Sequence, residues 1–206
     1  MAVTTLWLLV GLGNPGASYA KNRHNVGFMA LDAIADALGA PAFQEKKTAA
    51  ATSVDIKLDG QTHRLVLLKP LTYMNRSGPP VAEVARFYKI PPRRILVFHD
   101  ELALKTAKVK VKWGGGHAGH NGLKSLDAHV GKDYGRIRIG IDHPGIADAV
   151  TPYVLGNFRS EERTAIDALL ERIARDLPTL LESITQAGEA TLPSDVAGPF
   201  LTQIAL

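Results

Sequence analysis

The sequence contains no cysteine among its 206 residues. Disulfide bonds, cysteine-ligated zinc, iron–sulfur clusters and thiol nucleophiles are therefore excluded. Long apolar runs are also missing: residues 6–10 form the longest run, whereas a membrane-spanning helix needs about 20. No basic segment follows Met1, as it would in a secretory signal. These absences favour a cytoplasmic protein that is held together by its hydrophobic core.

Aromatic residues are scarce, at 6% of the chain, and they do not alternate with basic residues. This scarcity disfavours a surface that binds single-stranded nucleic acid by base stacking. The remaining composition, with 46% hydrophobic and 21% charged residues, is that of an ordinary globular protein. The length suits one domain, with or without a short terminal appendage.

Charge is distributed unevenly along the chain. Residues 160–206 contain eight acids and three bases, a net charge of −5, whereas residues 1–159 have a net charge of +9. A basic body attracts phosphates and releases their counterions on binding, so it indicates a polyanionic partner. A lysine-rich solvated surface would give the same totals, so the charge alone does not decide between the two.

Four lysines lie within residues 105–112, and the last three alternate with valines. In a strand, this alternation places those lysines on one face, about 7 Å apart, and the valines on the other. Such a row suits the phosphates of a nucleic-acid strand. The alternative is an edge strand whose lysines prevent pairing with other sheets. The lysines are Lys105, Lys108, Lys110 and Lys112, and a second basic group comprises Arg86, Lys89, Arg93 and Arg94.

Strand-like and helix-like patterns alternate along the chain, and several of the strands are continuously apolar. This order predicts a single three-layer α/β domain over residues 1–188, with a mixed twisted sheet flanked by helices, and a loose tail over 189–206. Pro178 is expected to interrupt the last long helix, which begins at Ser160. The predicted strands are 5–10, 52–58, 62–68, 95–99, 107–113 and 136–141, and the predicted helices are 26–38, 79–88, 123–130, 160–173 or beyond, and 180–187.

Residues 11–16 (GLGNPG) follow the first predicted strand and match the G-x-G-x-x-G pattern. A dinucleotide site also needs a helix that opens at the third glycine and an acid at the end of a second strand. Here residues 23–25 delay the helix, and the acids at the right distance, Asp32 and Asp36, fall in a helical pattern. A tight turn between strand and helix is therefore favoured over nucleotide binding.

His24 stands at the predicted start of a helix, and Asp100 closes a buried strand. An imidazole titrates near neutral pH, and a carboxylate on one of its nitrogens leaves the other able to activate water. The sequence does not show that the two side chains meet. A capping role for His24 and a polar strand end for Asp100 are the plain alternatives.

Two further polar segments precede predicted helices. Residues 72–78 (TYMNRSG) contain Asn75, which could be only a turn or capping residue. Residues 114–122 (GGGHAGHNG) contain five glycines, with Asn121 as a candidate helix cap. His117 and His120 could bind a metal, but no carboxylate pattern accompanies them. No G-x-S-x-G nucleophile motif is present.

One candidate base, one carboxylate, several carboxamides and a row of lysines thus stand out. Carboxamides hydrogen-bond to peptide groups and to a developing oxyanion without carrying charge. The set suits the attack of water on an acyl group whose leaving part is an anionic molecule.

The combination resembles bacterial-type peptidyl-tRNA hydrolase over most of residues 6–160. The matching stretches, in the order of that family, are VGLGNPGASYAKNRHNVGF (10–28), KPLTYMNRSG (69–78), FHDEL (98–102), GGGHAGHNGLKSL (114–126) and RIRIGIDHPG (136–145). The resemblance implies hydrolysis of the ester bond between a peptide and tRNA, which releases tRNA for reuse in translation. It also implies a cytoplasmic monomer that needs no metal, no cofactor and no obligate protein partner.

The resemblance also implies roles for individual residues. His24 would be the general base and Asp100 the residue that orients it, and Asn14 or Asn75 would stabilise the oxyanion. The implied substrate-binding residues are Tyr19, Tyr73, Asn75, His120 and Asn121, and the implied tRNA-binding residues are Lys105, Lys108, Lys110 and Arg138. Ala103 and Ala118 depart from the usual pattern of the family, and neither belongs to the proposed chemistry.

Three other function classes remain open at this point. A noncatalytic RNA-binding module would use the lysines but would give His24 no task. A peptidase or amidase would use the amides but not the basic surface. A dinucleotide-dependent enzyme would use the first glycine-rich loop.

Overall fold

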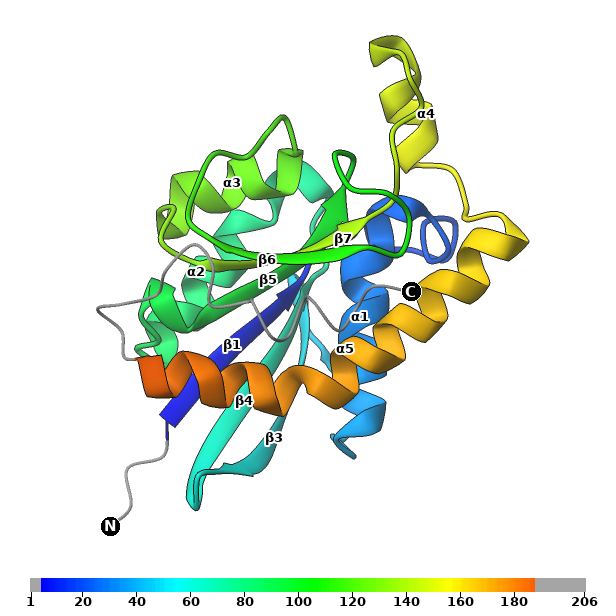
Figure 1. The fold of residues 1–206 in the computed structure, drawn as a ribbon. Helices are drawn as coiled ribbons and strands as arrows, with labels where there is room; N and C mark the ends of the chain where they lie inside the picture. Colours follow the sequence, from blue (N-terminus) through cyan, green and yellow to red (C-terminus); the bar gives the residue numbers. More distant parts are fainter. Residues whose placement is uncertain (1–4, 188–206) are drawn as a thin grey trace.

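The computed structural model describes residues 5–187 and contains one mixed sheet of seven strands, in the order β2-β3-β4-β1-β5-β7-β6 (Figure 1). The three-layer α/β prediction is confirmed, because helices cover both faces of this sheet. The strands are β1 (Thr5–Gly11), β2 (Gln44–Glu45), β3 (Ala49–Leu58), β4 (Gln61–Pro70), β5 (Ile95–Glu101), β6 (Val109–Trp113) and β7 (Gly135–Gly140).

The four central strands are parallel: β1 pairs with β4 and β5, and β5 pairs with β7. The outer strands β2, β3 and β6 run antiparallel to their neighbours. The carboxyl ends of β1 and β5 therefore meet at one edge of the sheet, which is where α/β folds place their ligand sites.

The two faces of the sheet pack against different helices, because side chains alternate along each strand. On one face, Leu9 and Phe98 pack with α1 and α5, and on the other, Val10 and Val97 pack with α2 and α3. The helices are α1 (Val26–Ala37), α2 (Gly78–Phe87), α3 (Asn121–Val130), α4 (Val150–Val154) and α5 (Ser160–Ala187).

Two glycines allow α1 to approach the strands closely. A Cβ atom on Gly27 would lie 2.3 Å from the Phe98 carbonyl oxygen and 2.5 Å from the Leu12 nitrogen, and a Cβ atom on Gly11 would lie 2.4 Å from the Gly27 oxygen. Distances this short are forbidden to real atoms, so only glycine fits at these two positions. The first turn of α1 consequently lies directly against β1 and β5.

The predicted break at Pro178 is wrong, since α5 is one continuous helix with the proline inside it. Proline removes one helical hydrogen bond. Leu177, Leu180 and Leu181 around it are buried, however, and pack against the same core. Burial of a leucine side chain contributes about 1.5–3 kcal/mol, so the tertiary packing outweighs the local cost. The predicted helix 180–187 is the end of α5.

Other differences are smaller. The sequence did not predict α4 or β2, and it placed the start of β6 two residues early. The expected tail at 189–206 lies outside the described residues. Within residues 5–187, no helix is both long and apolar enough to span a membrane.

Candidate active site

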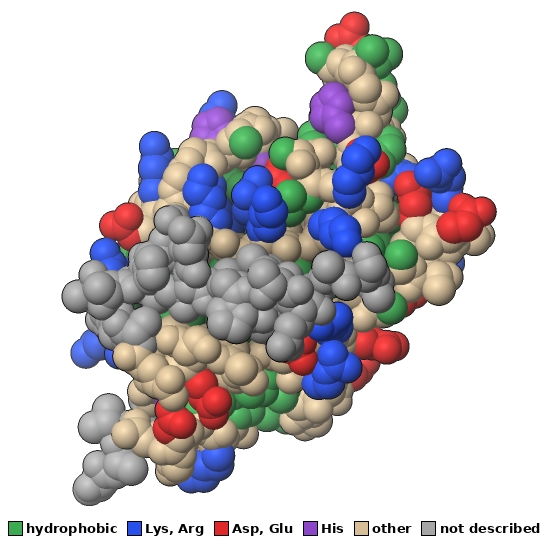
Figure 2. All heavy atoms as spheres, in the orientation of Figure 1, with side chains coloured by type: hydrophobic (Ala, Val, Ile, Leu, Met, Phe, Trp, Pro, Cys, Tyr) green, Lys and Arg blue, Asp and Glu red, His purple; other side chains and the backbone are tan. Residues whose placement is uncertain are grey.

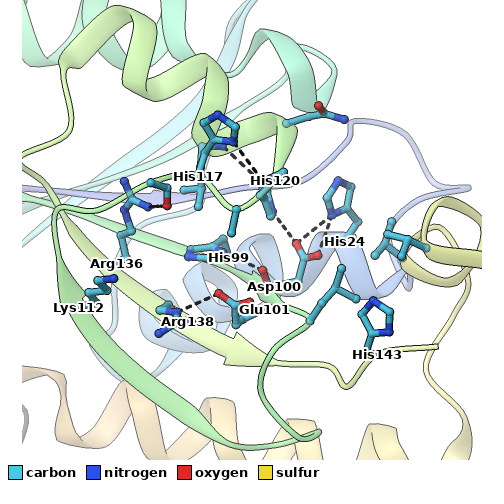
Figure 3. Close-up of a pocket in the computed structure, with 18 of the residues that line it drawn as sticks. His24, His99, Asp100, Glu101, Lys112, His117, His120, Arg136, Arg138 and His143 are labelled. Atoms are coloured by element: carbon cyan, nitrogen blue, oxygen red, sulfur yellow. Dashed lines mark hydrogen bonds and ion pairs between the residues drawn. The ribbon is translucent and has the colours of Figure 1, made fainter. Parts of the chain in front are cut away.

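A cavity of about 450 Å³ opens beyond the carboxyl end of β5 (Figure 3). The short 3-10 helix before α1, the end of β5, the glycine-rich loop before α3, and α4 all contribute to its walls. Its polar lining residues include His24, His99, Asp100, Glu101, Lys112, His117, His120, Arg136, Arg138 and His143.

His24 and Asp100 meet at this cavity, 76 residues apart in the sequence. His24 Nδ1 lies 2.9 Å from each carboxylate oxygen of Asp100. Asp100 is only 4% exposed, because it sits at the end of a central strand. An ionised carboxylate only accepts hydrogen bonds, so Nδ1 carries the proton and Nε2 keeps a lone pair. Nε2 points away from Asp100 (Figure 3).

His120 contacts the same carboxylate from the other side, with its Nε2 2.9 Å from Asp100 Oδ1. Its Nδ1 accepts hydrogen bonds from the backbone nitrogens of Gly122 and Leu123, so His120 caps α3. Since Nδ1 must accept, the hydrogen of neutral His120 is on Nε2 and is donated to Asp100. The candidate cap Asn121 is instead the exposed first residue of the helix.

The network sets the protonation of its members. Burial alone would lower the pKa of His24, but the charge and the hydrogen bond of Asp100 outweigh burial and raise it. Burial opposes the charge of Asp100 as well, yet the two histidines hold the pKa of that carboxyl well below its ordinary value. At neutral pH, Asp100 is therefore ionised, and its negative charge makes His24 a stronger base.

His24, Asp100 and His120 also form the kind of cluster that can hold a metal ion, with one ligand atom of each within 4.8 Å of the others. The chemistry of His120 argues against a metal. Its Nε2 could bind a metal only after losing the hydrogen, while its Nδ1 is already occupied by two N–H donors. The three residues therefore fit a hydrogen-bonded network better than a metal site.

Asn14 is buried and hydrogen-bonded at both its backbone and its side chain. It lines a second cavity rather than the one around Asp100, and it is linked to the site through Asn25, the neighbour of His24. Its backbone nitrogen donates to Asn25 Oδ1 at 2.9 Å, and its own Oδ1 accepts from the Met74 nitrogen at 2.8 Å. These bonds orient the carboxamide and use its oxygen, so Nδ2 is the group that can donate to a ligand. Asn14 thus differs from Asn75 and Asn121, which are exposed.

The remaining predicted substrate residues include an aromatic pair. The rings of Tyr19 and Tyr73 lie edge to face, with 6.4 Å between their centroids. Tyr73 is 59% exposed. Neither tyrosine lines the cavity around Asp100, and Asn75 does not line it either, whereas His120 and Asn121 do.

The predicted tRNA-binding residues fall on and around the neighbouring antiparallel strands β6 and β7. Lys110 on β6 lies directly opposite Arg138 on β7, and Arg138 Nε donates to Glu101 Oε2 at 2.9 Å. Lys108 immediately precedes β6, and Lys105 is paired with Asp142 at 3.2 Å. Figure 2 shows Lys and Arg side chains gathered across the upper half of the face around these strands.

The structure of β6 is compatible with both interpretations of the lysine pattern. It is the edge strand of the sheet, with Lys110 and Lys112 exposed and Val109 and Val111 buried. The lysines can therefore prevent sheet extension and still present charge to a ligand.

The sequence analysis gave no site role to four residues of this region, although it named Lys112 in the lysine pattern. Lys112 and Arg136 line the cavity, and the alternation of bases along β6 and β7 could have indicated both. His99 is fully buried in the cavity wall and donates from Nδ1 to the Asp100 carbonyl oxygen at 2.8 Å. Burial, together with the nearby His120, lowers the pKa of His99 to about 3, so it is neutral. Arg23 is the fourth.

Arg23, next to His24, forms hydrogen bonds with α4 and with the residues that follow it, and α4 is one wall of the cavity. Its Nη1 donates to the Asn157 carbonyl oxygen at 2.8 Å and its Nη2 to Glu162 Oε2 at 2.7 Å. Its guanidinium lies 4.2 Å from the centroid of the Tyr153 ring. No sequence pattern could have indicated these contacts, because the partners lie more than 125 residues away.

An α/β sheet with a carboxylate-bound histidine at an open crevice suits an enzyme that activates water, as hydrolases do. Comparisons with known proteins identify the family to which this enzyme belongs. The family model described as peptidyl-tRNA hydrolase matches residues 8–195, and the chain belongs to this family.

The relatives cover nearly the same length as this chain. A peptidyl-tRNA hydrolase of Beijerinckia indica is 54% identical over 84% of this chain and 85% of its own. One of Methylocella silvestris is 50% identical over 92% and 94%. A crystal structure of peptidyl-tRNA hydrolase from Acinetobacter baumannii has a TM-score of 0.80 at 35% identity, over 99% and 97% of the two chains.

The prediction from the sequence is therefore confirmed at the level of fold, family and reaction. The chain is a hydrolase that cleaves the ester bond between peptide and tRNA in peptidyl-tRNA and releases the tRNA. A dinucleotide-dependent enzyme and a noncatalytic RNA-binding module are excluded by the same finding.

Proposed function

We propose that His24 is the general base of this reaction. The observation that carries the proposal is the contact of His24 Nδ1 with both oxygens of Asp100, which leaves Nε2 as the acceptor facing the cavity. Nε2 takes a proton from water, and the resulting hydroxide attacks the ester carbonyl carbon of the last residue of the peptide. The imidazolium that forms is stabilised by the Asp100 carboxylate.

The carbonyl oxygen becomes an oxyanion in the tetrahedral intermediate. Asn14 Nδ2 is the donor that we assign to it, because the Met74 N–H fixes the other end of the carboxamide. One such donor is worth about 10²–10³ in rate. The intermediate collapses when the ribose oxygen of tRNA leaves and receives the proton from His24, which restores the base.

The substrate spans two chemically different surfaces in this proposal. The tRNA lies along the basic residues of the β6–β7 side, namely Lys105, Lys108, Lys110 and Arg138 with the additional Lys112. The end of the peptide lies beside Asn14, where Tyr19, Tyr73, Asn75 and Asn121 offer polar and aromatic contacts. His120 acts through Asp100 as a positioning residue, although its place in the cavity also leaves it within reach of substrate.

Replacement of Lys108 and Lys110 by alanine should weaken tRNA binding and make it less dependent on salt. Each lost phosphate contact lowers the slope of log affinity against log salt by about 1. The measurement is filter binding of uncharged tRNA between low and moderate salt. Arg175→Gln, which removes an exposed base from α5, is the matched control and should leave the slope as it is. An unchanged slope in the double variant would remove these lysines from the interface.

The rate should depend on pH through His24, because only neutral imidazole accepts a proton. The carboxylate raises the pKa of His24 above 6.5. We therefore expect kcat/KM to fall as the pH drops through a value higher than that of a free histidine, and to level off above it. Measurement of kcat/KM from pH 5 to pH 9 with a short peptidyl-tRNA tests this expectation. An acid limb at or below the free-histidine value would contradict it.

We also propose that the enzyme acts as a monomer in the cytoplasm and needs neither a metal nor a protein partner. The buried Asp100 and its two histidines come from one chain, which supports a site complete within one copy. Sedimentation at assay concentrations tests the monomer, and hydrolysis of a short substrate in the presence of a chelator tests the metal. A peptide amide of matched sequence tests the peptidase alternative. It should not be cleaved, because its leaving group lacks the phosphates that bind to the basic surface of the enzyme.

A further inference from the structure

The end of α2 carries an exposed surface that does not line the cavity around Asp100. We define the α2-terminal patch as Arg86, Phe87, Tyr88, Lys89 and Arg93. All five residues are exposed, and Phe87 reaches 77%, an unusual value for a phenylalanine. The rings of Phe87 and Tyr88 lie edge to face with 4.9 Å between their centroids. Between Arg86 and Arg94 the sequence contains four bases and no acid.

The backbone holds these side chains outward in a fixed arrangement. After α2, the Ile90 nitrogen bonds to the Ala85 oxygen at 2.8 Å and the Lys89 nitrogen to the Arg86 oxygen at 3.1 Å. This pair of bonds is the Schellman motif, and the buried Ile90 supplies its usual apolar contact. Pro91 and Pro92 then stiffen the turn into β5. An ordered surface loses little entropy when a ligand binds to it.

Lys89 occupies the position of this motif where glycine is usual. Its φ angle is 54°, in the left-handed region that costs a residue with a side chain. The backbone at Lys89 is therefore strained where a glycine would not be, and the side chain places an exposed cation beside the two aromatic rings.

The patch is separate from the active site. β5 runs from the patch to Asp100, and a strand of its 7 residues is about 20 Å long. Figure 1 shows α2 on the side of the molecule away from α4. A ligand of the patch therefore leaves the cavity around Asp100 open.

We propose that the α2-terminal patch binds unpaired nucleotides of an RNA, as a second contact distinct from the hydrolytic site. The aromatic rings provide faces on which bases stack, and the surrounding guanidinium and ammonium groups pair with the phosphates between them. Residues 86–94 contain no acid, which disfavours a basic partner. An acidic protein would satisfy the charges but would leave the exposed rings without a specific role.

The test is fluorescence anisotropy of a labelled ten-residue oligouridine, compared with the double variant Phe87→Ser, Tyr88→Ser. Loss of stacking should lower its affinity by about tenfold or more, since each stacked base contributes on that scale. Heparin, a polyanion without bases, should bind as before, and kcat/KM for a short peptidyl-tRNA should not change. The unchanged hydrolysis separates this proposal from the one for the active site.

Lys89→Gly is the second variant, and it separates folding from binding. Removal of the strained φ angle should raise the melting temperature, whereas removal of the cation should weaken oligouridine binding and its salt dependence. Arg175→Gln again serves as the control for charge.

Three results would overturn the proposal. Unchanged oligouridine binding in the double variant would remove the patch from RNA contact. Equal losses for oligouridine and heparin would assign it to acidic partners in general. Sedimentation that shows a dimer in the parent and a monomer in the double variant would assign it to a second copy of the chain.

Discussion

His24→Ala should abolish measurable hydrolysis of peptidyl-tRNA while tRNA binding persists. Alanine removes the group that takes the proton from water, and general-base assistance is worth about 10²–10⁴ in rate. His24 hydrogen-bonds to Asp100 rather than to the lysines on and around β6, so the affinity for tRNA should stay close to that of the parent. Single-turnover hydrolysis and filter binding of uncharged tRNA give the two quantities.

His143→Ala is the matched control for this variant. His143 lines the same cavity, but the Asp100 carboxylate hydrogen-bonds to His24 and His120 and not to His143, so loss of His143 should cost far less activity. If His24→Ala lost tRNA binding in the same proportion as turnover, His24 would be a binding residue and another group would have to serve as the base.

Asp100→Asn should be almost as damaging, although it changes one atom. A carboxamide can present its NH₂ group to His24 Nδ1, which favours the tautomer with the hydrogen on Nε2 and removes the lone pair that accepts the proton from water. In a comparable histidine–aspartate pair this substitution lowers kcat by about 10⁴, and we expect a loss of at least about 10². Steady-state kinetics from pH 5 to pH 9 measure it.

The pH profile distinguishes a catalytic effect of this substitution from simple misfolding. The charge and the hydrogen bond of Asp100 raise the pKa of His24, so the residual activity of Asp100→Asn should titrate at a lower pH than that of the parent. A variant that had merely lost folded enzyme would keep the parent profile at reduced amplitude. That outcome would leave the orienting role of Asp100 without support.

Much of the fold could be predicted because local patterns and tertiary packing agree. The apolar stretches of β1 and β5 and the helical spacing of α1 are all satisfied by the observed core. Pro178 shows the opposite case: the rule that proline ends a helix is local, and the buried leucines on both sides decide the outcome. The sequence around Pro178 does not show which core residues those leucines pack against.

The active site likewise contains some residues that the sequence could indicate and others that it could not. His24 and Asp100 could be proposed from residue type and position, since each stands at the end of a predicted element. The role of His120 could not, because its tautomer follows from two backbone N–H groups and a carboxylate 20 residues away. Propensity instead favoured Asn121 as the cap. Likewise, the scarcity of aromatic residues disfavoured stacking, yet Phe87 and Tyr88 are adjacent and exposed.

The close packing of Gly11 and Gly27 has a consequence for how the enzyme can change during evolution. The separation between the proton acceptor and the group that orients it depends on how near α1 can come to the sheet, and that approach is limited by backbone atoms alone. A single added methyl group at Gly27 would push apart two chemical groups that it never touches. Random mutagenesis should therefore recover inactive enzymes altered at these two glycines, with every reactive side chain still present.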